Sequence, residues 1–130
     1  LLAAEENSTG NWPNNPPWQE LHVESLPSGE QVVMLVGQAG RSHWSMSVTV
    51  ENEQQTILFD VACRVRDRPK FLGATYELIA PQQIAVEKVA VDGSPPASLC
   101  QSADRIAIEA DIDVQPPATI RWAYRVAFAK

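Results

Sequence analysis

The sequence predicts an all-β domain, an antiparallel sandwich of two sheets, and two observations carry this prediction. First, apolar and polar residues alternate over several segments, most regularly over residues 118–130. A period of two is the pattern of a strand with one buried face. Second, Gly, Pro, Asn and Asp recur at short intervals between these segments, as turns between strands require. No segment shows the apolar spacing of a long helix, so seven or eight strands are expected.

The first strands are expected to form a hairpin. Residues 21–24 alternate between apolar and polar, residues 27–30 read Pro-Ser-Gly-Glu and supply a turn, and residues 31–36 are almost wholly apolar. The apolar run predicts a central strand that ends at Gly37. Residues 44–51 then alternate cleanly, which predicts a strand with one face towards solvent.

A second hairpin follows from the next alternating segment. Residues 56–66 place aliphatic, aromatic and cysteine side chains on one face and polar ones on the other, and residues 52–55 form a short polar connection to the preceding strand. Two amphipathic strands joined in this way indicate a β-hairpin. Pro69 cannot donate to a central ladder, so the strand should end before it, and residues 72–78 resume the alternation.

The last third of the chain contains one ambiguous segment. Residues 82–91 could open as a short helix after Pro81, but their valines have low helix propensity, so we expect a strand. Residues 105–113 and 118–130 alternate and are predicted as strands without an alternative. A partly closed barrel is the alternative to the sandwich, since a strand count does not reveal closure. The sandwich is expected to be immunoglobulin-like in architecture.

Residues 1–20 are rich in Asn and Pro and are predicted to form an arm attached to a single domain, residues 21–130. Trp12 and Trp18 would be costly to leave in water, so at least one should dock on the domain. The alternative is an exposed aromatic contact surface for a sugar or a peptide.

Composition excludes some functions. The 130 residues carry a formal charge of −6, which argues against nucleic-acid binding, and no apolar run reaches the length of a transmembrane helix. The chain begins Leu1-Leu2-Ala3-Ala4, which would suit the tail of a signal peptide, so we expect an exported protein, periplasmic, cell-envelope or extracellular.

The cysteine count fits this expectation. Cys63 and Cys100 are predicted to form a disulfide, with two unrelated buried thiols as the alternative. The two histidines and two cysteines lack the spacing of a zinc site, so neither a metal nor another cofactor is expected.

The most specific surface feature is a set of basic residues at every second position, which we call the basic stripe. A strand would project them to one side, where their guanidinium groups could hold carboxylate, sulfate or phosphate. The alternative is cross-strand pairing with Glu109 and Asp111 of the preceding strand. The stripe comprises Arg64, Arg66, Arg68 and Lys70, together with Arg121 and Arg125 on the polar face of the last strand.

Catalytic and metal-binding motifs are weak. No nucleophile elbow or phosphate-binding glycine loop is present, and the acidic residues 109, 111 and 113 fit a solvated strand face better than a calcium loop. The sequence therefore favours a non-catalytic binding module that contacts a protein or a polysaccharide through the basic stripe. A structural or assembly protein that pairs through its arm or an edge strand is the alternative, and an enzyme without a motif is the least favoured class.

Overall fold

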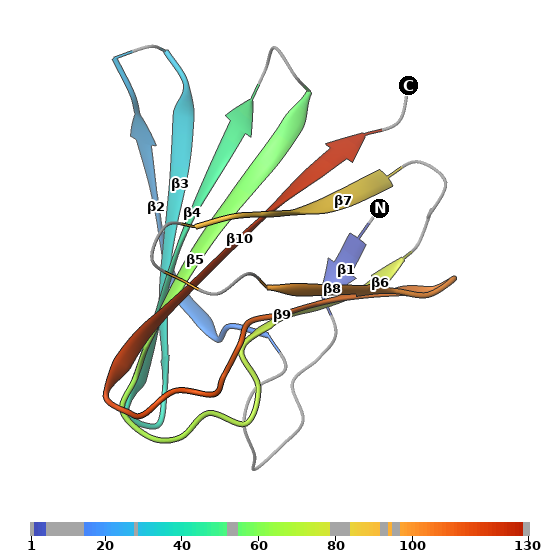
Figure 1. The fold of residues 1–130 in the computed structure, drawn as a ribbon. Helices are drawn as coiled ribbons and strands as arrows, with labels where there is room; N and C mark the ends of the chain where they lie inside the picture. The colour runs from blue at the N-terminus through green and yellow to red at the C-terminus, as the bar shows by residue number, and fades with distance from the viewer. Residues whose placement is uncertain are drawn as a thin grey trace.

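The computed structural model describes residues 2–4, 15–27, 29–51, 55–78, 84–91, 94 and 97–128, and all regular structure in these residues is β-strand (Figure 1). The described strands form a six-stranded sheet of order β2-β3-β4-β5-β10-β7 and a four-stranded sheet of order β1-β6-β9-β8. Every pairing within them is antiparallel. The bounds are β1 Leu2–Ala4, β2 Trp18–Ser25, β3 Gln31–Ala39, β4 Ser42–Glu51, β5 Thr56–Val65, β6 Gly73–Leu78, β7 Ile84–Val89, β8 Ser98–Gln101, β9 Arg105–Glu109 and β10 Ala118–Phe128.

This architecture confirms the all-β class and the two antiparallel sheets, whereas the barrel alternative is wrong because the sheets do not close on each other. The disputed segment after Pro81 is a strand, β7, as expected. Two described strands were not predicted, β1 within the proposed arm and the four-residue β8. The boundary between an arm, residues 1–20, and a domain, residues 21–130, stays a prediction.

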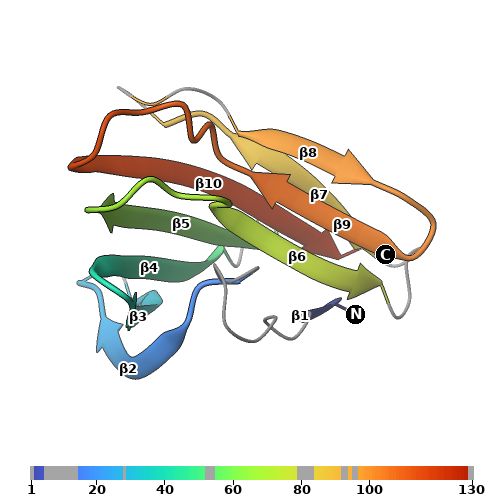
Figure 2. The ribbon, with the colours of Figure 1, turned by 90° about the horizontal axis from the view of Figure 1, so that it is seen from below.

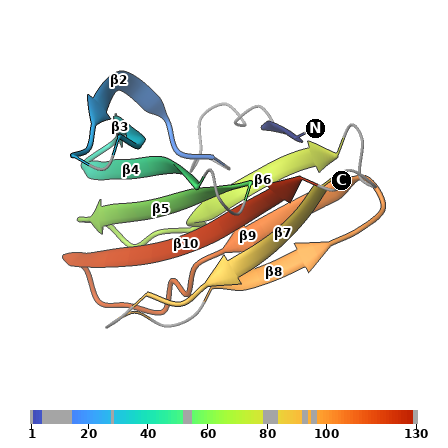
Figure 3. The same ribbon diagram turned by 90° about the horizontal axis from the view of Figure 1, so that it is seen from above.

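The core lies between the two sheets, which stack face to face (Figures 2 and 3). Alternate residues of β4, β5 and β10 point inward from the larger sheet, and alternate residues of β6 and β9 meet them from the smaller one. Burial of these apolar side chains is the main driving force of the fold. The main inward residues are Trp44, Met46, Val61, Cys63, Val65, Ala74, Leu78, Ile106, Ile108, Ile120, Trp122, Tyr124 and Val126.

Strand β10 is the longest described strand and lies between β5 and β7. It pairs with β5 from Ala118 to Ala127 and with β7 from Ala123 to Phe128. Its inward Tyr124 stacks on Phe59 of β5, with ring centroids 4.9 Å apart, and its hydroxyl is hydrogen-bonded to the hydroxyl of Tyr76 on β6. Burial raises the pKa of both tyrosines, most strongly that of Tyr124. A polar contact between neutral hydroxyls therefore links the two sheets.

The predicted disulfide between Cys63 and Cys100 is wrong, since both cysteines are free. Cys63 is fully buried on the inward face of β5. Cys100 is exposed on β8 of the other sheet, where its neighbour Leu99 is the residue that packs on the core. Alternation along a strand sends adjacent side chains to opposite faces, so Cys100 points away from Cys63. Burial raises the pKa of the Cys63 thiol to about 12.

Strand β3 does not end at Gly37, as the sequence had suggested, but continues to Ala39. Glycine is needed there for another reason, because the backbone at Pro17 crosses directly over it. A Cβ at position 37 would lie 2.0 Å from the Pro17 carbonyl oxygen. The turn itself comes later, at Gly40, whose φ is 58°.

Asn15 fastens the segment before β2 to the smaller sheet. Its side chain is buried, its Oδ1 accepts the Thr75 N–H at 2.9 Å, and its Nδ2 donates to the Thr75 carbonyl at 3.3 Å. On the same side of β6, strand β1 pairs with residues 76–78. The Asn15 amide thus occupies the next ladder position and imitates a peptide group.

Gly37→Ala is expected to lower the free energy of unfolding by about 3 kcal/mol, the upper end of the usual cost of overpacking, because the new methyl group meets backbone that cannot rotate away. Chemical denaturation measures the change. Gly29→Ala is the control, since a Cβ at that position meets nothing within 4 Å and only the φ of 90° is strained. A loss at Gly37 no larger than the loss at Gly29 would contradict the close approach of Pro17.

Asn15→Ala should cost about 1–3 kcal/mol of unfolding free energy, because two backbone groups of Thr75 lose their partner in a buried place. Urea denaturation checks the value. Asn15→Asp keeps the acceptor but not the donor, so it should recover only part of the loss. Full stability of the alanine variant would show that the Asn15 amide contributes no net stabilisation.

Candidate functional site on the outer face

The outer face of the six-stranded sheet, the side turned away from the core, is the candidate functional surface. Three shallow hollows open on it, of about 230, 290 and 310 Å³. They form because short side chains in mid-sheet, such as Ser45 and Ala62, stand between longer ones. The same alternation that fills the core therefore shapes this face, since each outward residue is flanked by two inward ones.

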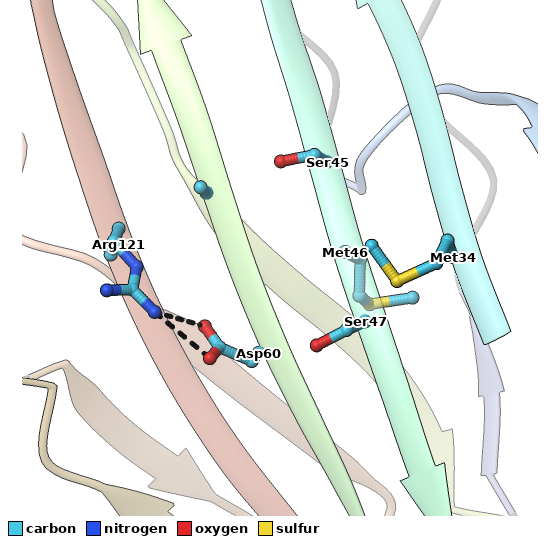
Figure 4. Close-up of a pocket in the computed structure, with 7 residues that line it drawn as sticks. Met34, Ser45, Met46, Ser47, Asp60 and Arg121 are labelled. Atoms are coloured by element: carbon cyan, nitrogen blue, oxygen red, sulfur yellow. Dashed lines mark hydrogen bonds and ion pairs between the residues drawn. The ribbon is translucent and has the colours of Figure 1, made fainter. Parts of the chain in front are cut away.

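The central hollow contains an ion pair between neighbouring strands (Figure 4). The Arg121 Nη2 of β10 lies 3.0 Å from Oδ2 and 3.2 Å from Oδ1 of Asp60 on β5. Ser45, Ser47 and Met34 line the opposite side. Because its guanidinium group already pairs with the Asp60 carboxylate, Arg121 is poorly placed to bind an external anion.

Arg125 is the centre of a second, less exposed charge cluster. Its Nε lies 2.7 Å from Glu51 Oε1 on β4, and its Nη1 lies 3.1 Å from Glu87 Oε1 on β7. Thr56 also donates its hydroxyl to Glu51 at 2.8 Å. These hydrogen bonds, chiefly the one from Arg125, hold the pKa of Glu51 below its usual range. The cluster ties four strands together across the sheet.

Arg64 lies in a different environment, at the far end of the face. Its cross-strand neighbours are His43 on β4 and Thr119 on β10, and its Nη1 donates to the Thr119 hydroxyl at 3.3 Å. These three residues and Ser45 line the hollow of about 290 Å³. Among the described residues, no carboxylate forms an ion pair with Arg64.

The structure thus divides the predicted basic stripe. Arg64, Arg121 and Arg125 share the outer face of adjacent strands, as expected if the strands were neighbours. Arg66, Arg68 and Lys70 lie beyond the end of β5 in an exposed bend, and none forms an ion pair with a described carboxylate. The nearby pair in this bend joins Arg41 to Asp67.

The alternative prediction, that Glu109 and Asp111 pair with the basic stripe across neighbouring strands, is wrong. Glu109 ends β9, which belongs to the smaller sheet, and Asp111 follows it. The alternative prediction assumed that strands adjacent in sequence are adjacent in the sheet. Asp60 was not identified from the sequence as the partner of Arg121. Its place on the polar face of its strand was predicted, but the pairing of that strand with β10 was not known from the sequence.

Of the two tryptophans predicted as aromatic contact residues, the structure describes only Trp18. Trp18 is half-buried at the start of β2 and packs against the core, which is the arrangement that docking predicts. Trp12 lies outside the described residues. Within the described part of the chain, no three His, Cys, Asp or Glu residues gather as metal ligands, and no helix is long and apolar enough to cross a membrane.

Comparison with known proteins found no protein-family model, no curated protein and no solved structure that matches the chain.

Arg125→Gln should lower the free energy of unfolding by about 1 kcal/mol at pH 7, a value near the upper end for a partly exposed ion pair. Because the folded-state pKa of Glu51 is depressed, this stabilisation exists above the ordinary glutamate pKa of about 4.3 and is lost as the pH falls. Urea denaturation at pH 7 and pH 3 measures both effects.

Arg66→Gln is the matched control, since it removes the same charge from a residue without a described ion-pair partner. The deficit of Arg125→Gln should shrink as the pH falls from 7 to 3, because protonation of Glu51 removes the negative charge of the pair. An equal deficit at the two pH values would contradict the ion-pair explanation.

Proposed function

We propose that this chain is a non-catalytic binding module of an exported or cell-envelope protein, and that it holds an anionic group in the hollow at Arg64. The group would be a carboxylate, sulfate or phosphate carried by a protein or a polysaccharide. One observation carries the proposal. Arg64 is the arginine of the outer face that has no described carboxylate partner, and it lines a hollow together with other hydrogen-bond donors.

The chemistry of the hollow suits an anion. The guanidinium group offers a planar fork of donors that matches two oxygens of a carboxylate or phosphate. The hydroxyls of Ser45 and Thr119 and the imidazole of His43 surround it. Arg66 and Arg68 in the adjacent bend add local positive potential to an acidic protein, which would draw an anion towards this end of the sheet.

The non-catalytic part of the proposal rests on the absence of an activated nucleophile. In the described ranges no serine, threonine or cysteine is hydrogen-bonded to a histidine, the arrangement that most often activates a hydroxyl or thiol. The buried Cys63 thiol has a raised pKa and is inert at neutral pH. Fold class alone does not decide function.

Export and an immunoglobulin-like architecture belong to the same proposal. The two stacked antiparallel sheets support the architecture. Export draws no support from a disulfide and stays a prediction from the sequence.

Arg64→Gln should weaken binding of a sulfated polysaccharide at least tenfold, because the neutral amide loses both charge and fork geometry. Isothermal titration at low and at physiological salt measures the affinity, with inorganic phosphate and a neutral glycan as further probes. Binding by the unaltered protein should fall with salt, as an electrostatic contact requires.

Lys88→Gln is the matched control, since it removes one positive charge from exposed β7 on another part of the sheet. It should bind as the unaltered protein does. Equal losses in the two variants would assign the affinity to net charge, and undiminished binding by Arg64→Gln would exclude the hollow.

A further inference from the structure

Strand β2 forms one edge of the six-stranded sheet, and β3 is its single strand neighbour among the described residues. Every residue from Gln19 to Ser25 is exposed. The backbone N–H and C=O groups on the outer side of such an edge have no ladder partner, which makes the edge a template for another strand.

The part of β2 from Leu21 to Ser25 lacks the lysine, proline and bulge that commonly protect an edge. Edges are normally blunted by lysine, proline, an inward-pointing charge or a bulge. Trp18–Ser25 contains no lysine and no proline. Its single irregularity lies between Trp18 and Glu20, so Leu21–Ser25 pairs with β3 in unbroken register.

Two rows of apolar cross-strand neighbours extend from β4 through β3 to β2, and the last residue of each row is exposed to solvent. One row crosses from Met46 through Leu35 to Leu21, and another from Val48 through Val33 to Val23. Met46, Leu35 and Val48 pack in or against the core. Leu21 is 64% and Val23 50% exposed. Figures 2 and 3 show why, since β2 and β3 lie at the end of the larger sheet that is remote from β8.

The opposite face of β2 is polar and mainly acidic. Glu20, His22 and Glu24 alternate with the two apolar residues, and His22 Nε2 lies 3.3 Å from Glu24 Oε1. A strand added to this edge would place its own apolar residues beside Leu21 and Val23. Its alternate residues would face the two glutamates, where opposite charge is favourable and like charge is not.

A second copy of β2 fits this edge poorly. Antiparallel pairing centred on His22 would match Leu21 with Val23 of the second copy, but it would set Glu20 against Glu24 of the second copy twice. Moving the centre to Leu21 or Val23 pairs His22 with a glutamate, yet it places an apolar residue opposite Gln19 or Ser25. Each of these three antiparallel registers therefore leaves one of the two faces poorly matched.

We propose that β2 binds an extended segment of another protein in which apolar residues alternate with Lys or Arg, and that this segment continues the six-stranded sheet by one strand. Backbone ladder bonds supply affinity, and the alternation of apolar and basic side chains supplies specificity. This edge is a different surface from the hollow at Arg64, and neither proposal depends on the other.

The test uses three synthetic peptides of equal length on the full chain. One alternates Val and Lys, the second alternates Val and Glu, and the third repeats the first with all backbone amides N-methylated. Fluorescence anisotropy should give at least tenfold tighter binding for the Val/Lys peptide than for the other two. Hydrogen exchange should slow at residues 21–25 when it binds.

Two variants and their controls separate this mode from charge alone. Glu20→Lys with Glu24→Lys should reverse the preference between the Lys and Glu peptides, whereas Glu77→Lys with Glu109→Lys, the same charge change on the smaller sheet, should not. Val23→Lys should weaken binding, and Ala85→Lys at the opposite edge should not.

Three results would overturn the proposal. The first is equal affinity for the Lys and Glu peptides, or none for either. The second is undiminished binding of the N-methylated peptide. The third is a concentration-dependent dimer in analytical ultracentrifugation that Val23→Lys abolishes, because it would assign the edge to a second copy.

Discussion

The register of β10 between β5 and β7 is the constraint on which the rest of the structure depends. It points Trp122 and Tyr124 into the core, where both are about 1% exposed, and Arg121 and Arg125 away from it. A slip of one residue would exchange the two faces and bury the arginines. Burial of large aromatic side chains thus fixes which residues stand on the outer face, and the candidate site is a consequence of the core.

The same register decides which arginines remain available. Arg121 and Arg125 lie on β10, which has β5 on one side and β7 on the other. Their carboxylate partners are Asp60 on β5, Glu87 on β7 and Glu51 on β4, one strand further away. Arg64 lies near the end of β5, where its neighbours are His43 and Thr119. The arginines of β10 on this face are therefore used for cross-strand pairing, and the proposed anion site at Arg64 lies where that pairing stops.

The strands were predictable wherever alternation was long, because period two directly reports one buried face, and β4, β5 and β10 were found close to their expected positions. The four-residue β8 and the three-residue β1 carry too little pattern to be recognised. Partners were less predictable than strands, since pairing is non-local. Glu109 and Cys100 were misassigned because their strands belong to the smaller sheet, while Asp60 was overlooked although its face was correctly predicted.

The unequal width of the two sheets explains why the proposed strand-binding edge continues the rows of the core. A four-stranded sheet cannot cover the inner face of a six-stranded one, so the rows that begin at Met46 and Val48 must end uncovered at Leu21 and Val23. Little apolar area is buried by β2, and its contribution to stability is correspondingly small. A strand added there would bury those side chains and satisfy backbone groups without disturbing β10. The edge can therefore gain a partner without a rearrangement of the core that holds Arg64 in place.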